Sequence, residues 1–114
     1  MKRTYEEMPP ISRAEAAMAF KSDKTDNIVR ALLRLALNDS DWRWVQGHCL
    51  SFLKHKDRWV RGAAAISLGH LARIHGQLDL DVVIPELERL STDPKMDGKA
   101  QDALDDIRTH VDKR

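Results

Sequence analysis

The chain is short of cysteine and of long apolar runs, and both shortages narrow what it can be. Its single cysteine, Cys49, cannot form an internal disulfide, which favours a reducing compartment. No stretch approaches the roughly 18 apolar residues that a membrane-spanning helix needs. The basic first three residues lead into polar residues and Pro9-Pro10 instead of the apolar core of a signal peptide. We therefore expect a cytoplasmic protein with no membrane partner.

A strong overall charge of either sign is also missing. The formal net charge is +1, which removes the composition argument for a nucleic-acid-binding protein. Residues 1–75 carry thirteen Lys or Arg against eight Asp or Glu, whereas residues 76–114 carry six against ten. The two parts therefore present electrostatic fields of opposite sign. Hydrophobic residues make up 42% of the chain, which is enough for one globular core.

Apolar residues recur with the 3.6-residue period of an α-helix, and no stretch shows the sustained alternation of a strand. We therefore expect an all-α protein. Ser12 and Glu15 have the spacing of a capping box, which predicts a first helix over residues 12–21. A second helical pattern stops at the polar residues 38–40.

The next two helices are predicted to begin at capping aspartates. Asp41 opens a third helix that ends near His55, and Asp57 opens a fourth that reaches Ile74 or His75. Gly76 is well placed to terminate the fourth helix in a left-handed conformation. This helix is apolar around nearly its whole circumference, so we expect it to be the central packing element.

The last two helices carry prolines near their starts. Asp81 is expected to begin a fifth helix with Pro85 in its first turn, where a missing N–H is tolerated. Asp93 and Pro94 are expected to open the sixth. Its predicted buried face consists of Ala100, Ala103, Leu104, Ile107 and Val111.

The chain contains an internal repeat with the length of a helical hairpin. A shift of 36 residues places Asp57 on Asp93 and Gly62 on Gly98. The same shift aligns Val60 with Met96, Ala64 with Ala100, Leu68 with Leu104, and Leu71 with Ile107. Six helices that repeat in this way are expected to stack as a solenoid.

Residues 57–69, with the sequence DRWVRGAAAISLG, resemble the second helix of a HEAT repeat, and residues 41–107 resemble about two such units. The resemblance implies a right-handed α-α superhelix of about three HEAT-like hairpins. Residues 1–11 would be an irregular tail and residues 12–114 a single domain, with a degenerate capping pair of helices around residues 12–38. A generic helical bundle is the alternative arrangement.

The second copy of the repeat departs from the family pattern at two positions. Asp97 replaces Arg61, the residue that a HEAT repeat uses for a contact with an aspartate, and Asp105 replaces Gly69. The resemblance therefore leaves the Asp–Arg contact between repeats in question at the second copy.

Residues with catalytic or metal-binding potential are scattered. The five histidines match no metal-ligand motif, and Cys49 lies on an apolar helical face where packing explains it better than nucleophilic chemistry. The sequence also lacks a phosphate-binding glycine loop and a nucleophile elbow. We expect no cofactor, no metal and no enzymatic activity.

Three tryptophans, Trp42, Trp44 and Trp59, lie at the starts of two consecutive predicted helices. These tryptophans could have a structural role, as large rings that close a small core. Alternatively, they could have a functional role, as an aromatic anchor for a partner. Trp42 is expected to be the most exposed, because Val45 and Cys49 continue a helical face that it does not share.

A basic cluster surrounds the predicted turn between the third and fourth helices. The candidate patch consists of Lys54, Lys56, Arg58 and Arg61, with His55 and Trp59 among them. Basic residues with an interleaved aromatic can bind a phosphate backbone. HEAT-like DNA glycosylases resemble this arrangement but are longer, and we regard nucleic acid as an unlikely partner.

An acidic cluster on the predicted sixth helix is the preferred binding site. Asp102, Asp105 and Asp106 fall within an arc of about 100° opposite the apolar stripe, and Asp97 borders it. Like charges four residues apart slightly destabilise a helix, and a basic partner would explain their presence. The alternative is an ordinary solvated face, balanced by Lys99 and Lys113.

The Trp-rich third helix and the acidic ALDDI segment together resemble small HEAT-like bacterial immunity proteins of contact-dependent growth inhibition systems. The resemblance implies a stoichiometric inhibitor that binds a cognate toxin, often a basic nuclease, with Asp97, Asp102, Asp105, Asp106 and Trp42 as candidate contacts. A general cytoplasmic adaptor and a short nucleic-acid-binding relative of the glycosylases are the alternatives. The oligomeric state stays open.

Overall fold

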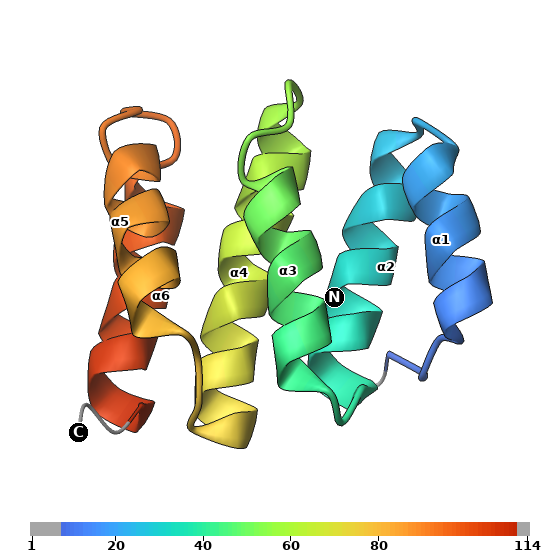
Figure 1. The fold of residues 1–114 in the computed structure, drawn as a ribbon. Helices are drawn as coiled ribbons and strands as arrows, with labels where there is room; N and C mark the ends of the chain where they lie inside the picture. The colour runs from blue at the N-terminus through green and yellow to red at the C-terminus, as the bar shows by residue number, and fades with distance from the viewer. Residues whose placement is uncertain (1–7, 112–114) are drawn as a thin grey trace, which may run out of the picture.

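The computed structural model describes residues 8–111, in which six helices form three successive hairpins (Figure 1). The helices are α1 (Arg13–Lys21), α2 (Thr25–Asn38), α3 (Trp42–Phe52), α4 (Arg58–His75), α5 (Leu80–Leu90) and α6 (Asp97–His110). Within the described range there is no strand, so the all-α prediction is confirmed. Residues 1–7 of the expected tail lie outside the described residues. The part from Met8 to Ile11 is not helical.

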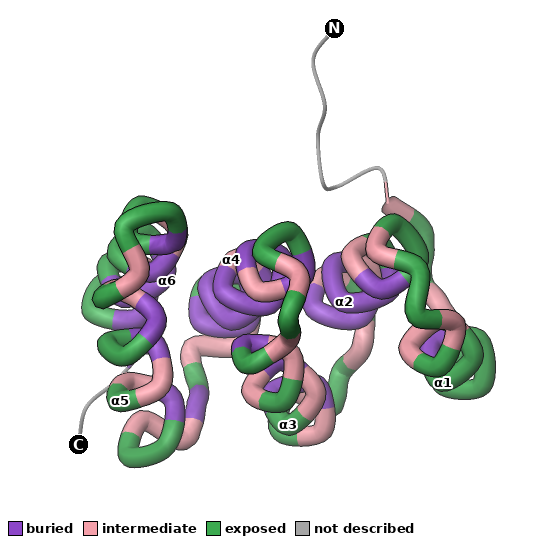
Figure 2. The backbone as a smooth tube through the Cα atoms, turned by 90° about the horizontal axis from the view of Figure 1, so that it is seen from above, coloured by how far each residue is buried: buried purple, intermediate pink, exposed green. Residues whose placement is uncertain are grey.

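The hairpins stand side by side and leave the helices in two rows (Figure 2). One row consists of α2, α4 and α6, and the other of α1, α3 and α5. Helix α4 packs against α2 on one side, α6 on the other and α3 behind. Its Val60, Leu68 and Leu71 are fully buried, which confirms the prediction that this helix is the centre of the core.

Local sequence signals account for several helix ends. The Ser12–Glu15 capping box forms at the start of α1. The carboxylates of Asp41 and Asp57 accept backbone N–H groups at the starts of α3 and α4. Gly76 ends α4 with a φ of 64°, a conformation that costs glycine little. The predicted buried face of α6 is also confirmed, from Ala100 to Val111.

Three predicted helix boundaries were wrong. Helix α3 ends at Phe52, three residues before His55. Helix α5 begins at Leu80, because the carbonyl of Asp79 already accepts the N–H groups of Val82 and Val83, and Pro85 therefore lies inside the helix.

The start of α6 was predicted too early. Asp93 and Pro94 belong to a separate turn, in which the Asp93 carbonyl accepts the N–H groups of Met96 and Asp97. The Asp93 carboxylate accepts the N–H of Lys95 at 3.0 Å. The aspartate therefore stabilises this turn, and the helix starts at Asp97.

Polar contacts join neighbouring hairpins at a regular sequence interval. Thr25 Oγ1 donates to Asp57 at 2.6 Å, Gln46 Nε2 donates to Asp79 at 2.8 Å, Arg61 lies 3.5 Å from Asp93, and Arg73 lies 3.4 Å from Asp106. Each pair spans 32 or 33 residues. Thr25–Asp57 joins the first hairpin to the second, and Arg61–Asp93 joins the second to the third at equivalent positions 36 residues further along. The other two pairs also join the second hairpin to the third.

Candidate functional site

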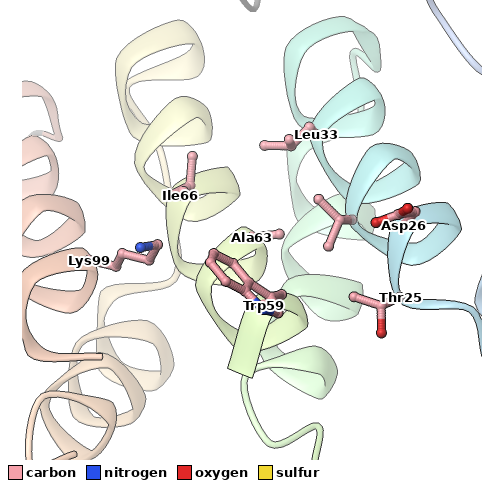
Figure 3. Close-up of a pocket in the computed structure, with 8 residues that line it drawn as sticks. Thr25, Asp26, Leu33, Trp59, Ala63, Ile66 and Lys99 are labelled. Atoms are coloured by element: carbon pink, nitrogen blue, oxygen red, sulfur yellow. The ribbon is translucent and has the colours of Figure 1, made fainter. Parts of the chain in front are cut away.

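The surface of the α2, α4 and α6 row, which we call the open face, contains two adjoining depressions. The first lies between α2 and α4 and has a volume of about 380 Å³ (Figure 3). Its apolar lining consists of Val29, Leu33, Trp59, Ala63 and Ile66. Thr25 and Asp26 of α2 and Lys99 of α6 complete the lining. The second depression lies between α4 and α6, and Ile66 and Lys99 border both.

Trp59 is the exposed tryptophan, and the expectation that Trp42 would be the most exposed was wrong. Trp59 is 59% exposed, whereas Trp42 and Trp44 are half-buried against the core. Val60 takes the buried position in the first turn of α4, so the Trp59 ring beside it lies on the open face. A large exposed apolar ring beside a hollow is typical of a binding surface.

Lys99 reaches the first depression from α6 because α4 has a glycine opposite it. A Cβ added at Gly62 would lie 2.8 Å from Lys99 Cδ, so a larger residue there would displace the flexible end of this side chain. Figure 3 shows the side chain extending from α6 towards α4. Lys99 makes no ion pair or hydrogen bond with any described residue. Within residues 8–111 its ammonium therefore has no carboxylate at salt-bridge distance, although Asp102 and Asp106 line the second depression with it.

The second depression contains a polar network that links α4 to α6. The Arg73 guanidinium contacts His70 Nδ1 on its own helix and Asp106 across the seam. A Cβ at Gly69 would lie 2.7 Å from Asp106 Oδ2, so this glycine also makes room for a side chain of α6. His70 is buried at 4% exposure. The network fixes the two helices to each other.

The four acidic residues of α6 do not form one uniform surface. Asp106 was expected opposite the apolar stripe, but it lies half-buried at the α4–α6 seam, because Gly69 lets α6 approach closely there. Asp105 is paired with Arg108 at 3.0 Å. Asp97 and Asp102 are exposed, and Asp102 lines the second depression.

The residues of the basic cluster have different neighbours, and Arg61 stabilises the α3–α4 turn. Arg61 donates to the carbonyls of His55 and Lys56 and pairs with Asp93, as the HEAT resemblance implies for this arginine. Lys54 lies 4.0 Å from Glu86. The Arg58 guanidinium lies 5.4 Å from the Trp59 ring centroid. These contacts divide the predicted patch among several neighbours.

Cys49 is enclosed in the core beside Ser67. Burial raises the pKa of the Cys49 thiol to about 12, so the thiol stays protonated at neutral pH. Among residues 8–111, no cluster of three or more His, Cys, Asp or Glu side chains is arranged to hold a metal ion. None of the helices in that same range has both the length and the apolar character needed to cross a bilayer.

The sequence contained an overlooked signal for the open face. Trp59, Ala63 and Ile66 are spaced i, i+4 and i+7, so they form a stripe along α4. The apolar circumference of this helix predicts burial on several sides, and this prediction obscures the stripe. Since α4 has neighbours on only three sides, this stripe stays partly uncovered. Lys99 could not be assigned to the same surface without the approach of α6 to Gly62.

Comparison of the chain with known proteins found no matching family model, no matching curated protein and no matching solved structure.

Proposed function

We propose that the protein is a short HEAT-like solenoid that binds another protein through its open face. The contacts Thr25–Asp57 and Arg61–Asp93, at equivalent positions in successive units, support this arrangement over a generic bundle, because a solenoid joins each unit to the next in the same way. The contact between Arg61 and Asp93 supports the HEAT-like character. The observation that carries the binding role is Trp59, which is 59% exposed beside an apolar depression.

The specific form that we propose is an immunity protein, which would act in the cytoplasm by binding a cognate toxin and blocking its activity. Asp97 and Asp102 supply exposed carboxylates for a basic toxin, while Asp105 and Asp106 are partly neutralised by arginines. Complementary charge would speed association with such a partner. A general adaptor for the cell's own proteins is the second candidate, because the same face would serve it.

A capture experiment tests protein binding. The tagged protein is used to capture partners from its native lysate, alongside Trp59→Ala and the matched control Met18→Ala, which removes another exposed apolar side chain, on α1. Hot-spot aromatics contribute about 2 kcal/mol or more, so the Trp59 variant should bind a purified partner at least about 30-fold more weakly. The Met18 variant should bind normally. Equal binding by both variants would contradict the proposal that the partner binds to the open face.

A co-expression experiment separates the two candidates. The captured partner is expressed with and without this protein in a host cell, and survival is measured. An immunity protein restores growth to cells that express a toxic partner, and the Trp59→Ala variant does so less well. A partner that is harmless on its own contradicts the immunity role and favours the adaptor.

A further inference from the structure

We infer that the first depression binds a partner segment in one orientation, with an apolar side chain between α2 and α4, a carboxylate beside Lys99 and a basic group beside Asp26. This inference rests on the proposed function, because it describes how the open face would recognise its protein partner. The segment is defined by the order basic, apolar, acidic across the three helices.

The apolar part of the segment follows from the shape and lining of the depression. Ala63 forms a small buried base at 4% exposure, and Leu33 beside it is 7% exposed. Val29 and Ile66 are half-buried, and the Trp59 ring lies in front of Ala63 (Figure 3). A Leu- or Phe-sized side chain would cover these surfaces and remove them from water, which is the main source of affinity at an interface.

The acidic part follows from Lys99. Its stem lies over Gly62 of α4, and Lys99 lines the same depression as the apolar residues. Lys99 has no ion pair among the described residues. A carboxylate on the partner would give this ammonium its missing counter-charge next to the apolar slot.

The basic part follows from Asp26 at the opposite end. Asp26 is exposed in the first turn of α2 and lines the same depression as Lys99. The two residues come from different helices, with α4 between them (Figure 3). A segment that crosses the row therefore meets a negative end and a positive end, and the reversed orientation would place like charges together.

A nucleic acid fits this surface poorly. Asp26 at one end, and Asp102 and Asp106 in the adjoining depression, would repel a phosphate backbone. The basic residues Lys54 and Arg61 are already paired elsewhere. A protein segment with both signs of charge meets no such repulsion.

A displayed library of random 12-residue peptides provides the probe. The full chain is used for selection, and binders that also bind Ala63→Phe are discarded, because the larger ring fills the slot. Circular dichroism and thermal melting verify that this variant folds. Val29→Trp, which fills the slot from the α2 side, serves if it does not. Selected peptides should carry a large apolar residue with a basic residue on one side and an acidic residue on the other.

The charge assignment is then tested on one purified peptide by fluorescence anisotropy. Lys99→Met keeps the stem over Gly62 and removes the charge, and it should weaken binding about fivefold. Lys99→Glu should weaken it further, and changing the peptide's acidic residue to lysine should restore the loss. The matched control is Lys95→Met, another lysine near the start of α6 but outside the depression, and it should bind as the wild type does.

Two results would overturn the inference: selected peptides without a charge order, or equal binding by the Lys99→Met and Lys95→Met variants. Its failure can be told apart from failure of the proposed function. A lysate partner that needs Trp59 but tolerates Lys99→Glu and the filled slot supports the function and contradicts the inference. A peptide that obeys the charge order while no lysate protein depends on Trp59 supports the inference's geometry and contradicts the function.

Discussion

The two rows of helices use aromatic residues in opposite ways. In the α1 and α3 row the rings contact one another edge-on or at a tilt. The ring centroids of Trp44 and His48 lie 4.6 Å apart, those of His48 and Phe20 4.9 Å, and those of Phe20 and Phe52 4.9 Å. Arg13 covers Trp44 at 3.9 Å from the ring centroid. On the α2, α4 and α6 row, Trp59 contacts no other aromatic ring among residues 8–111, and the Arg58 guanidinium lies 5.4 Å from its ring centroid.

This difference separates a ring that stabilises the fold from the ring that the proposed function uses for recognition. A ring that is enclosed by other rings lowers the free energy of the folded state, because its apolar surface is already covered. A ring that stays in water keeps that surface for a partner. Trp44 and Trp59 both stand near helix starts, so helix position alone does not decide the role. The packing of neighbouring helices decides whether the ring is covered or exposed.

The largest expected effect comes from removing the covered ring. Trp44→Ala should lower the free energy of unfolding by about 2–3 kcal/mol, somewhat less than for a fully buried aromatic because the ring is half-buried. Trp59→Ala should change it by less than about 0.5 kcal/mol, as is usual for an exposed position. Urea denaturation followed by circular dichroism measures both. A Trp59 variant as unstable as the Trp44 variant would contradict the contrast between the rows.

A pair of glycines gives a smaller effect. Gly47 on α3 has nothing within 4 Å of an added Cβ, so Gly47→Ala should stabilise the protein by about 0.5–1 kcal/mol through helix propensity. Gly69→Ala would displace the Asp106 carboxylate from Arg73, so its gain should be about 1 kcal/mol smaller or negative. Thermal melting of the two variants compares them directly. Equal gains would show that the Arg73–Asp106 contact contributes nothing.

The smallest effect is a pH dependence of stability that comes from His48, among the aromatic rings of α1 and α3. Burial first, and then the charge of Arg13, lowers the pKa of His48 below 6.5, so the unfolded chain binds the proton more readily than the folded one. Stability due to neutral His48 is therefore present above about pH 6.5 and declines as the pH falls towards the lowered value. Stability measured between about pH 5 and pH 8 should lose this slope in His48→Gln.

The carboxylates provide the control for the pH experiment. Hydrogen bonds from Thr25 and from the Trp59 N–H lower the pKa of Asp57, and those from Gln46 and Arg43 lower the pKa of Asp79. Their stabilising contribution is present above the ordinary value of 3.8 and is lost as the pH falls below it. Asp79→Asn should therefore lower stability at every pH above the acidic window but change the slope of stability against pH only within that window. A changed slope near pH 6.5 in this variant would contradict the assignment to His48.

The sequence predicted those features that depend on neighbours along the chain. The capping residues Ser12, Asp41 and Asp57 and the terminator Gly76 act within one or two helical turns, so their roles could be read directly. The apolar period of α6 likewise predicted its buried face. The prediction that α6 begins at Asp93 was wrong, because an aspartate can stabilise a tight turn as well as a helix start.

The candidate site depends on contacts between helices, which the sequence alone does not reveal. Asp106 lies on the seam where Gly69 faces it from α4, and Lys99 enters the depression over Gly62. Neither glycine marks its partner in the sequence. The expected acidic surface was therefore drawn from α6 in isolation, and the exposed ring was assigned to Trp42 when it is Trp59.

The contact between Gln46 and Asp79 also bears on the order in which the protein assembles. The Asp79 side chain makes no capping bond to α5, and the N–H of Asp79 instead donates to Gln46 Oε1 at 2.7 Å. Helix α1 is capped by its own residues, whereas the backbone N–H of Asp79 at the start of α5 is bonded to a side chain of α3. The third hairpin therefore becomes fully stable only once its neighbour is in place, and amide hydrogen exchange should show α5 opening without disturbing α1.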